Sequence, residues 1–435
     1  MTLLEPVLFR DGEPARRIDL HEAPDPGALV ARHVGHFALH ESTRGGEHWL
    51  ARDLLGVHKL FFAVAEDGRV DSSNYFFELR ALGHAPADIF SVPSGHFVRI
   101  DPRTRRYQLE RWGALHVGPR GNPGRALRLS EIGARIRGAL ENTFELLARR
   151  FTGRPVYVTL SGGLDSTTIA ALAREHFPDV RAVTFALRTP RISRGGDLFF
   201  ARRVAAELRL PLFEVQVDPE QVLELLDDVL VYGQDWRDFN VHCGLVNAAL
   251  GRAVAALHRD GPRPLTLTGD TMNELLADYA PVHLGGREYY ALPQVDPDAT
   301  RRFLVQGLDS GDREVGIFAR FGLDTVQPYA LCADEYAALP HELVCCDGGK
   351  ARTVRAVMGR RVPESVYRRP KVRAQVAVDG EPGGVLALLV ERGIDQHLLK
   401  SRFAELLGLA PGFARNLLRG GFYRFSTAYP EASTG

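Results

Sequence analysis

The sequence is poor in lysine and has no excess of charge of either sign. Lysine occurs at only four positions, Lys59, Lys350, Lys371 and Lys400, among 54 basic residues that balance 54 acidic ones. A formal charge of zero gives no indication of a nucleic-acid or anionic-membrane partner. The scarcity of lysine makes each of the four a candidate for a specific role.

Cysteine is also scarce, and no long apolar run occurs. The four cysteines, Cys243, Cys332, Cys345 and Cys346, lack metal-ligand spacing and have no secretory context. They are predicted to be reduced thiols. Because the chain also shows no signal pattern and no run long enough to cross a membrane, we expect a cytoplasmic protein.

The 435 residues allow two or three domains. Residues 1–120 read as β-rich, because short alternating runs such as 36–39 and 96–100 are separated by glycine, aspartate and proline. A Gly- and Pro-containing linker is predicted at Gly118–Pro123. We therefore divide the chain into a smaller region, 1–120, and a larger one, 125–435.

The larger region alternates between helical and strand patterns. An amphipathic helix is predicted at 129–150. Further helices are expected at 197–210, 219–231 and 241–258, and strands at 156–160, 181–187, 212–217 and 265–268. This alternation predicts an α/β fold with a doubly wound parallel sheet, followed by a helical C-terminal part. Ligands of such sheets bind at the carboxyl ends of the strands.

The most specific motif follows the first of these strands. Residues 161–166 read SGGLDS and connect a strand-forming run to a small, apolar, helix-forming one. An ordinary tight turn is the alternative interpretation. No Gly-Lys-Ser/Thr follows, so the motif is not a Walker loop. A strand, a glycine turn and a helix N-terminus together form a phosphate-binding site.

Each residue of this loop has a predicted role. Backbone approach and hydroxyl donors to the anion would come from Ser161, Gly162, Gly163 and Ser166. Asp165 is itself an anion, so it is predicted to bind Mg²⁺ that bridges it to phosphate oxygens.

The loop resembles the pyrophosphate-binding loop of the ATP pyrophosphatase family, and its spelling resembles the asparagine synthetase branch. In that family ATP is cleaved between the α and β phosphates, a carboxylate becomes an acyl-adenylate, and an amine displaces AMP. The resemblance implies ATP and Mg²⁺ as cofactors. It also implies that backbone groups at Thr184 and Phe185 hold the adenine and ribose.

A second element, Gly269–Tyr279, follows the strand predicted at 265–268 and resembles the family's SG-(E/D/Y)-G-x-D-E-L-F-G-G-Y segment. The resemblance places Gly269 at the nucleotide and Asp270 where a catalytic acid or tyrosine lies. Asn273 falls where the family has an aspartate that holds Mg²⁺. Either Asp270 or Glu274 compensates, or Asp165 and the phosphates hold the metal, or activity is reduced. A helix-capping loop is the alternative.

Three later segments show looser likeness to the family. Asp324 falls at the glutamate of a G-V-E-A-R-V-P-F segment, and Lys350 and Arg355 mark a K-x-x-L-R helix. Lys371 falls at the lysine that stabilises charge on the reacting centre. Polar loops and a solvated charge run are the alternatives. By resemblance, Asp270, Lys371 and Asp324 are the candidate catalytic residues.

The N-terminal region is similar to the later half of a class II glutaminase domain. The likeness rests on residues 51–63 and 92–96. That domain needs an N-terminal cysteine nucleophile, whereas this chain begins Met1-Thr2 and has no cysteine before Cys243. We therefore expect a degenerate, truncated glutaminase-like domain, and an amine other than ammonia from glutamine.

The expected function is ATP-dependent amide-bond formation between a small-molecule or peptide carboxylate and an amine, within or between molecules. Residues 398–425 resemble the end of carbapenam and β-lactam synthetases, which indicates specialised metabolism such as antibiotic biosynthesis. A non-catalytic or weakly active nucleotide-binding scaffold is one alternative. A tRNA-modifying enzyme is another, against which the neutral charge and the absence of CxxC argue. A homodimer is a family expectation.

Overall fold

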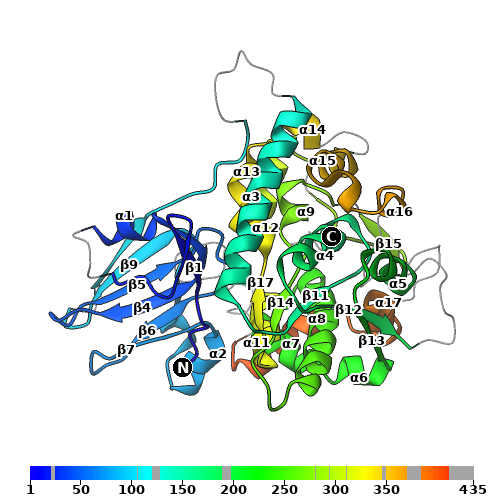
Figure 1. The fold of residues 1–435 in the computed structure, drawn as a ribbon. Coiled ribbons are helices and arrows are strands. Elements are labelled where there is room, and N and C mark those ends of the chain that lie inside the picture. The colour runs from blue at the N-terminus through cyan, green and yellow to red at the C-terminus, as the bar shows by residue number, and fades with distance from the viewer. Residues whose placement is uncertain are drawn as a thin grey trace.

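The computed structural model describes residues 1–20, 25–104, 106–119, 128–188, 197–279, 281–292, 294–309, 311–344, 349–369 and 384–410 (Figure 1). An antiparallel, β-rich N-terminal region precedes an α/β region, as the sequence predicts. None of the helices in these ranges combines the length and the apolar character needed to cross a membrane.

The N-terminal region consists of short antiparallel strands in three sheets. The first has the order β2 (Glu13–Ala15), β1 (Val7–Arg10), β3 (His33–His36). The second has the order β10 (Arg106–Arg111), β9 (His96–Asp101), β5 (His48–Arg52), β4 (Ala38–Ser42), and the third β7 (Val70–Ser73), β6 (Phe61–Val64), β8 (Phe90–Ser91). Two short helices, α1 (Pro26–Val30) and α2 (Phe76–Ala81), accompany them. Apolar side chains from facing strands form two small cores.

The α/β region is built on a five-stranded, fully parallel sheet. Its order is β13 (Leu212–Val217), β12 (Val180–Leu187), β11 (Val156–Thr159), β14 (Leu265–Leu267), β17 (Asp324–Val326). The chain therefore extends the sheet in one direction from β11 and then returns to add β14 and β17 on the other side. Such a reversal of strand order is where parallel α/β sheets bind ligands.

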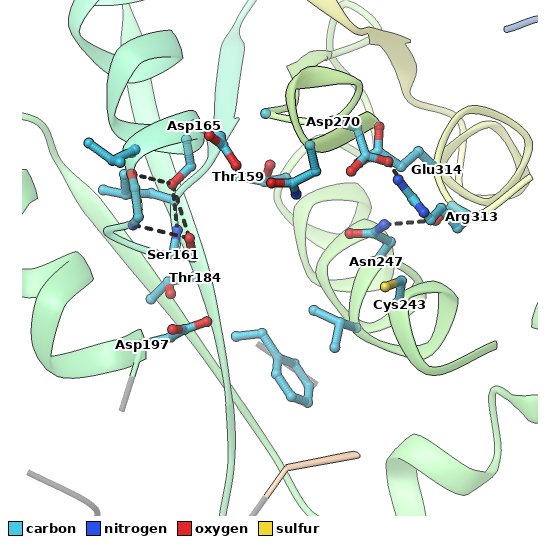
Figure 2. Close-up of a pocket in the computed structure, with 18 of the residues that line it drawn as sticks. Thr159, Ser161, Asp165, Thr184, Asp197, Cys243, Asn247, Asp270, Arg313 and Glu314 are labelled. Atoms are coloured by element: carbon cyan, nitrogen blue, oxygen red, sulfur yellow. Dashed lines mark hydrogen bonds and ion pairs between the residues drawn. The ribbon is translucent and has the colours of Figure 1, made fainter. Parts of the chain in front are cut away.

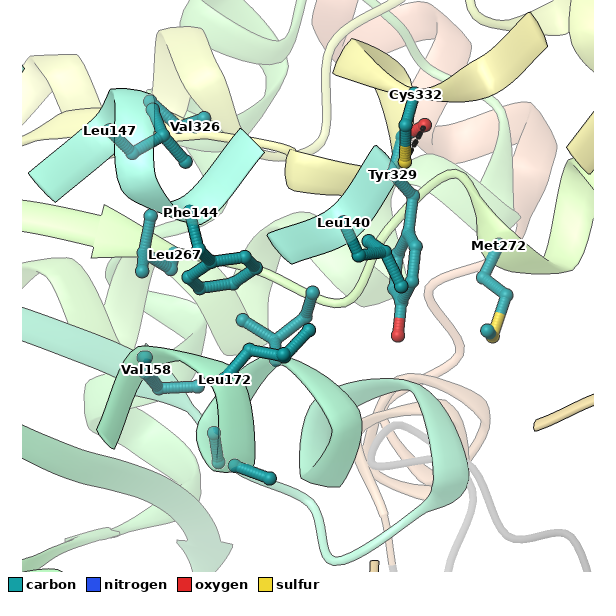
Figure 3. Close-up of a cluster of buried hydrophobic side chains, with 14 of the residues drawn as sticks. Leu140, Phe144, Leu147, Val158, Leu172, Leu267, Met272, Val326, Tyr329 and Cys332 are labelled. Carbon is teal, nitrogen blue, oxygen red and sulfur yellow. Dashed lines mark hydrogen bonds between the residues drawn. The ribbon is translucent and has the colours of Figure 1, made fainter. Parts of the chain in front are cut away.

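Helices cover both faces of this sheet because its central strands are apolar on both sides. Val156 and Val158 of β11 face the core formed with α3 (Leu129–Arg150) and α4 (Leu164–His176). Tyr157 between them faces the core that contains α7 (Leu226–Gly233) and α8 (Asp238–Leu257). Figure 3 shows Phe144 of α3 among the side chains of the first core.

The remaining described helices complete the two layers. On the α3 side lie α12 (Pro328–Leu331), α13 (Ala333–Ala337) and α15 (Gly349–Met358); on the α8 side lie α11 (Val315–Arg320), α17 (Val385–Glu391) and α18 (Gln396–Leu406). Other elements are α5 (Asp197–Leu208), α6 (Pro219–Leu223), α9 (Met272–Leu275), α10 (Pro297–Gly307), α14 (His341–Val344), α16 (Glu364–Tyr367) and the hairpin β15 (Val282–Leu284) and β16 (Arg287–Tyr289).

Buried polar contacts join the N-terminal region to the α/β region. The guanidinium of Arg52 lies 2.9 Å from a carboxylate oxygen of Asp309, and the Arg52 side chain is 1% exposed. Lys59 Nζ donates to the carbonyl of Leu308 at 2.6 Å. Tyr75 donates from its hydroxyl to the carbonyl of Gly316 at 3.0 Å. Because unpaired buried charge is costly, these contacts fix how the two regions meet.

Most predicted elements are found, and the differences are local. The helix predicted at 219–231 is divided into α6 and α7 by a turn at residues 224 and 225, for which the sequence offers no clear reason. The helix predicted at 197–210 ends at Leu208, because Arg209 adopts a left-handed φ of 53°. The predicted helical C-terminal part is present in residues 384–410 as α17 and α18, and its part beyond residue 410 lies outside the described residues.

Replacement of Phe144 by alanine tests the core between α3 and the sheet. The ring is fully buried, so we expect Phe144→Ala to lower the free energy of unfolding by about 3–5 kcal/mol. The neighbouring Glu145 is exposed, and Glu145→Ala is expected to change it by less than about 0.5 kcal/mol. Urea denaturation followed by circular dichroism measures both. Equal losses for the two variants would contradict this assignment of the core.

Candidate active site

A cavity of about 260 Å³ lies at the carboxyl ends of the strands where the strand order reverses (Figure 2). Its walls come from the loops that follow β11 and β14, from the end of β12 and from one face of α8. Residues of the 161–166 loop line one side, and Asp270, Arg313 and Glu314 line the other. The cavity therefore joins the two motifs that the sequence singles out.

The loop after β11 is tied into one shape by its own hydroxyl groups. Ser161 Oγ and Ser166 Oγ lie 3.1 Å apart, and Ser166 Oγ accepts from the backbone N–H of Ser161 at 3.2 Å. Gly162 has a φ of +75°, and a Cβ there would lie 2.7 Å from the backbone of Phe200. Only glycine suits this position. Helix α4 begins at Leu164, so the unpaired backbone N–H groups of its first turn lie at the end of this loop.

Arg369 holds the back of this loop. Its guanidinium donates to the carbonyl of Ser161 at 2.7 Å and pairs with Asp197 at 2.5 Å. It also lies over the ring of Phe200, 4.2 Å from the centroid. Its side chain is 3% exposed. A planar guanidinium that is buried and paired in this way fixes the loop's geometry.

The loop after β14 packs directly on the first loop. A Cβ at Gly269 would lie 2.9 Å from the backbone nitrogen of Ser166, so any larger residue would separate the two loops. Two positions farther, Thr271 adopts a φ of +79°, which is unusual for a β-branched residue. Its hydroxyl donates to the side-chain oxygen of Gln327 at 3.1 Å. The backbone strain is thus located beside the site.

Asp270 and Glu274 share one arginine at the cavity wall. Arg313 contacts Asp270 at 2.7 Å and Glu274 at 2.6 Å, and its guanidinium lies 4.9 Å from the ring centroid of Phe239. Tyr279 donates its hydroxyl to Glu274. Burial opposes the charge of Arg313, but the nearby carboxylates of Asp270 and Glu274 outweigh it and raise its pKa well above the ordinary value.

Glu314 is a further acidic residue of the cavity, which the sequence analysis missed. One carboxyl oxygen accepts from Thr268 Oγ1 at 2.6 Å and from Gln327 Nε2 at 3.0 Å. Burial, with the Asp270 carboxylate nearby, raises the pKa of Glu314 well above its ordinary value. In the sequence Glu314 stands only as an acidic residue before an apolar helix, and no motif marks it.

Lys350 reaches the other side of the cavity from α15. Its ammonium donates to Asp165 at 2.7 Å and to the Asn273 side-chain oxygen at 2.6 Å, and it lies 2.8 Å from Asp278. Burial lowers the pKa of Lys350, but Asp165 and Asp278 outweigh this effect and raise it. The sequence marked Lys350 on its helix without assigning it to these oxygens.

The structure brings together most of the residues predicted for the site. Those that line the cavity are Ser161, Gly163, Asp165, Ser166, Thr184, Phe185, Gly269, Asp270 and Asn273. Gly162 lies in the same loop and turns its backbone against Phe200. Lys371 lies outside the described residues, two positions after Arg369.

Asp324 is the one described candidate that the structure does not bring to the cavity. It is the first residue of β17 and lies beside Leu265, the first residue of β14, so it occupies the amino edge of the sheet. There it pairs with Arg154 at 2.7 Å and Arg263 at 3.1 Å. The sequence likeness gave its position along the chain but not the end of the strand at which it lies.

The residues present fit a nucleotide's phosphates and a hard cation. The anion cradle comprises the α4 N-terminus, two hydroxyls and Gly162, at which a Cβ would clash with Phe200. Asp165, Asn273 and Asp278 offer the oxygen ligands that Mg²⁺ prefers, and in the structure their oxygens surround a lysine ammonium. Among the described residues, no three His, Cys, Asp or Glu side chains gather as a metal site by themselves.

Together the fold and the site define a parallel α/β protein with a glycine- and serine-containing loop, suited to phosphate, at the reversal of its strand order. The family model described as asparagine synthase matches residues 135–302, which contain this loop and the loop after β14. Over about half of its length the chain is distantly related to glutamine-hydrolysing asparagine synthetases. It is 26% identical to that of Pongo abelii over a 255-residue alignment, and the match covers 54% of this chain and 44% of the relative.

A plant relative gives the same result. The chain is 26% identical to the glutamine-hydrolysing asparagine synthetase 2 of Arabidopsis thaliana over 249 residues, covering 55% of this chain and 40% of the relative. The chain thus spans less than half the length of these curated relatives. Among solved structures, the glutamine-dependent NAD⁺ synthetase of Acinetobacter baumannii has a TM-score of 0.31 and 14% identity, covering 77% of this chain and 53% of that one.

Replacement of Glu314 by glutamine tests the buried carboxyl group. A carboxyl whose pKa is raised in the folded state binds a proton there that it loses on unfolding, so its contribution to stability falls as pH rises above the ordinary value of 4.5. Glutamine cannot ionise. The stability of Glu314→Gln relative to the wild type is therefore expected to be greater at pH 8 than at pH 5. Urea denaturation at the two pH values measures it, and a constant difference would contradict the assignment.

Proposed function

We propose that this protein is an ATP-dependent amide-bond synthetase. A substrate carboxylate would be adenylated with release of pyrophosphate, and an amine would displace AMP. The amine would come from the same molecule or from a second substrate of a specialised biosynthetic pathway. The proposal extends the distant relationship to asparagine synthetases to a reaction class, and leaves the acid and the amine to be identified.

One observation carries the proposal: the anion cradle and the acidic cluster around Asp270 face each other across a single cavity (Figure 2). Adenylation needs the first feature to hold the phosphates of ATP, which when bound supplies the leaving group. Aminolysis needs the second, because the attacking amine must lose a proton. A protein that only bound nucleotide would have no need for carboxylates on the opposite wall.

We assign the residues of this chain the following roles in the proposed reaction. Ser161, Ser166 and the α4 N-terminus would hold the phosphates, and Arg369 would keep their loop in place. Asp270, ion-paired with Arg313, would accept the proton of the amine. Glu314, whose carboxyl group lies near Asp270, would assist Asp270 in this role in place of Asp324. Lys371 keeps the charge-stabilising role that the sequence suggests for it.

A nucleotide-binding scaffold with little or no catalytic activity is the second candidate. It is favoured by the position of Lys350, whose ammonium lies among the oxygens that a catalytic metal ion would need. Asn273, a weaker ligand than aspartate, points in the same direction. This candidate predicts ATP binding without pyrophosphate release in the presence of any acid and amine.

The function is tested by pyrophosphate release from Mg-ATP, screened over pairs of carboxylic acids and amines. With an active pair, Asp270→Asn is expected to reduce turnover by on the order of 10²–10⁴-fold, because the amine proton loses its acceptor. ATP affinity should change little, since Asp270 lies across the cavity from the phosphate loop.

Asp324→Asn is the matched control, because the same substitution is then made at the opposite edge of the sheet. Its turnover is expected to stay within about threefold of the wild type, a much smaller change than the one expected from the loss of a proton acceptor. If Asp324→Asn removed activity and Asp270→Asn did not, the proposed proton acceptor would be wrong. If ATP bound and no pair released pyrophosphate, the scaffold would replace the synthetase.

A further inference from the structure

We infer that Lys350 is a resident cation that competes with a divalent metal ion for the same three side-chain oxygens. Its ammonium lies between Asp165, Asn273 and Asp278. The inference rests on the proposed function only for the expectation that a metal ion is used here. Metal binding itself can be measured without any reaction.

The geometry of the ammonium carries the inference. The three oxygens lie 2.6–2.8 Å from Lys350 Nζ, which has three protons to donate. They come from α4, from α9 and from the residues after α9, and Lys350 approaches from α15. The ammonium therefore joins three separate segments of the chain, namely α4, residues 273–278 and α15.

The ammonium and a metal ion exclude each other. Mg²⁺ binds oxygen ligands at about 2.0–2.1 Å, so it would require the same oxygens at closer range than the ammonium has them. The Lys350 side chain is only 11% exposed, so water screens its charge weakly and the repulsion between the two cations is strong. Either the ammonium or the metal ion occupies this position.

The charge balance favours the ammonium in the absence of nucleotide. Asp165 and Asp278 contribute two negative charges, whereas Asn273 is neutral. Lys350 reduces the net charge of the group to about one negative charge. Such a site attracts a divalent ion weakly unless further anions arrive. Phosphates bound in the adjoining loop would be such anions, so we expect metal binding to depend on nucleotide.

The test is Mn²⁺ binding to the full-length, nucleotide-free protein, followed by the loss of the electron paramagnetic resonance signal of free Mn²⁺. Lys350→Met keeps the length of the side chain and removes its charge. It is expected to bind Mn²⁺ at least about tenfold more tightly than the wild type, because one adjacent positive charge is lost. Lys350→Met combined with Asp165→Asn should lose this gain.

Two control variants separate charge from the substitution itself. Lys350→Arg keeps the positive charge and should bind Mn²⁺ no better than the wild type. Lys400→Met removes a lysine that lies over Trp236, away from the cavity, and should also leave Mn²⁺ affinity unchanged. If Lys350→Met and the wild type bind Mn²⁺ equally, the inference is overturned, whatever the outcome of the pyrophosphate assay.

A measurement on the wild type covers the case in which Lys350→Met does not fold. An amine-reactive reagent and mass spectrometry report the modification rate of each lysine. The rate at Lys350 is expected to rise as Mn²⁺ approaches saturation, because the displaced ammonium becomes accessible, while the rate at Lys400 stays constant. A rate at Lys350 that does not respond to Mn²⁺ at any concentration would overturn the inference.

Discussion

The close contact between the loops after β11 and β14 is the constraint on which the site depends. Gly269 brings the second loop against the backbone of Ser166, and a side chain there would push the loops apart. Because β11 and β14 are adjacent and parallel, both loops leave the same edge of the sheet. The anion cradle and Asp270 are therefore held across one cavity by backbone packing instead of by flexible side chains.

The fold could be predicted from sequence because its signals are local. The strand at β11 and the helix at α3 follow from short runs of strand formers and from apolar periodicity. The same reasoning put Ser161–Ser166 and Asp270 at the carboxyl ends of their strands, where the structure has them, since a motif directly after a strand must lie at that strand's carboxyl end. Asp324 was misplaced because it begins its strand, and likeness in sequence does not say at which edge a residue lies.

Glu314 and Lys350 show what the sequence could not supply. Each reaches the site from an element distant in the chain, and its role is defined by partners that only the folded chain brings near it. Glu314 meets Thr268 and Gln327, and Lys350 meets oxygens that follow two different strands. Charge balance in a cavity is a property of the assembled walls, so no local pattern encodes it.

On each of the two walls of the cavity, one cationic side chain contacts two carboxylates. On one wall Arg313 partly neutralises Asp270 and Glu274, and on the other Lys350 partly neutralises Asp165 and Asp278. Each cation allows carboxylates to stay close together in a partly buried site, which would otherwise be unfavourable. The arginine cannot lose its charge, whereas the lysine ammonium lies among the oxygens that a metal ion would need. The cation of one wall is therefore permanent, whereas the cation of the other is the one that we propose a metal ion replaces.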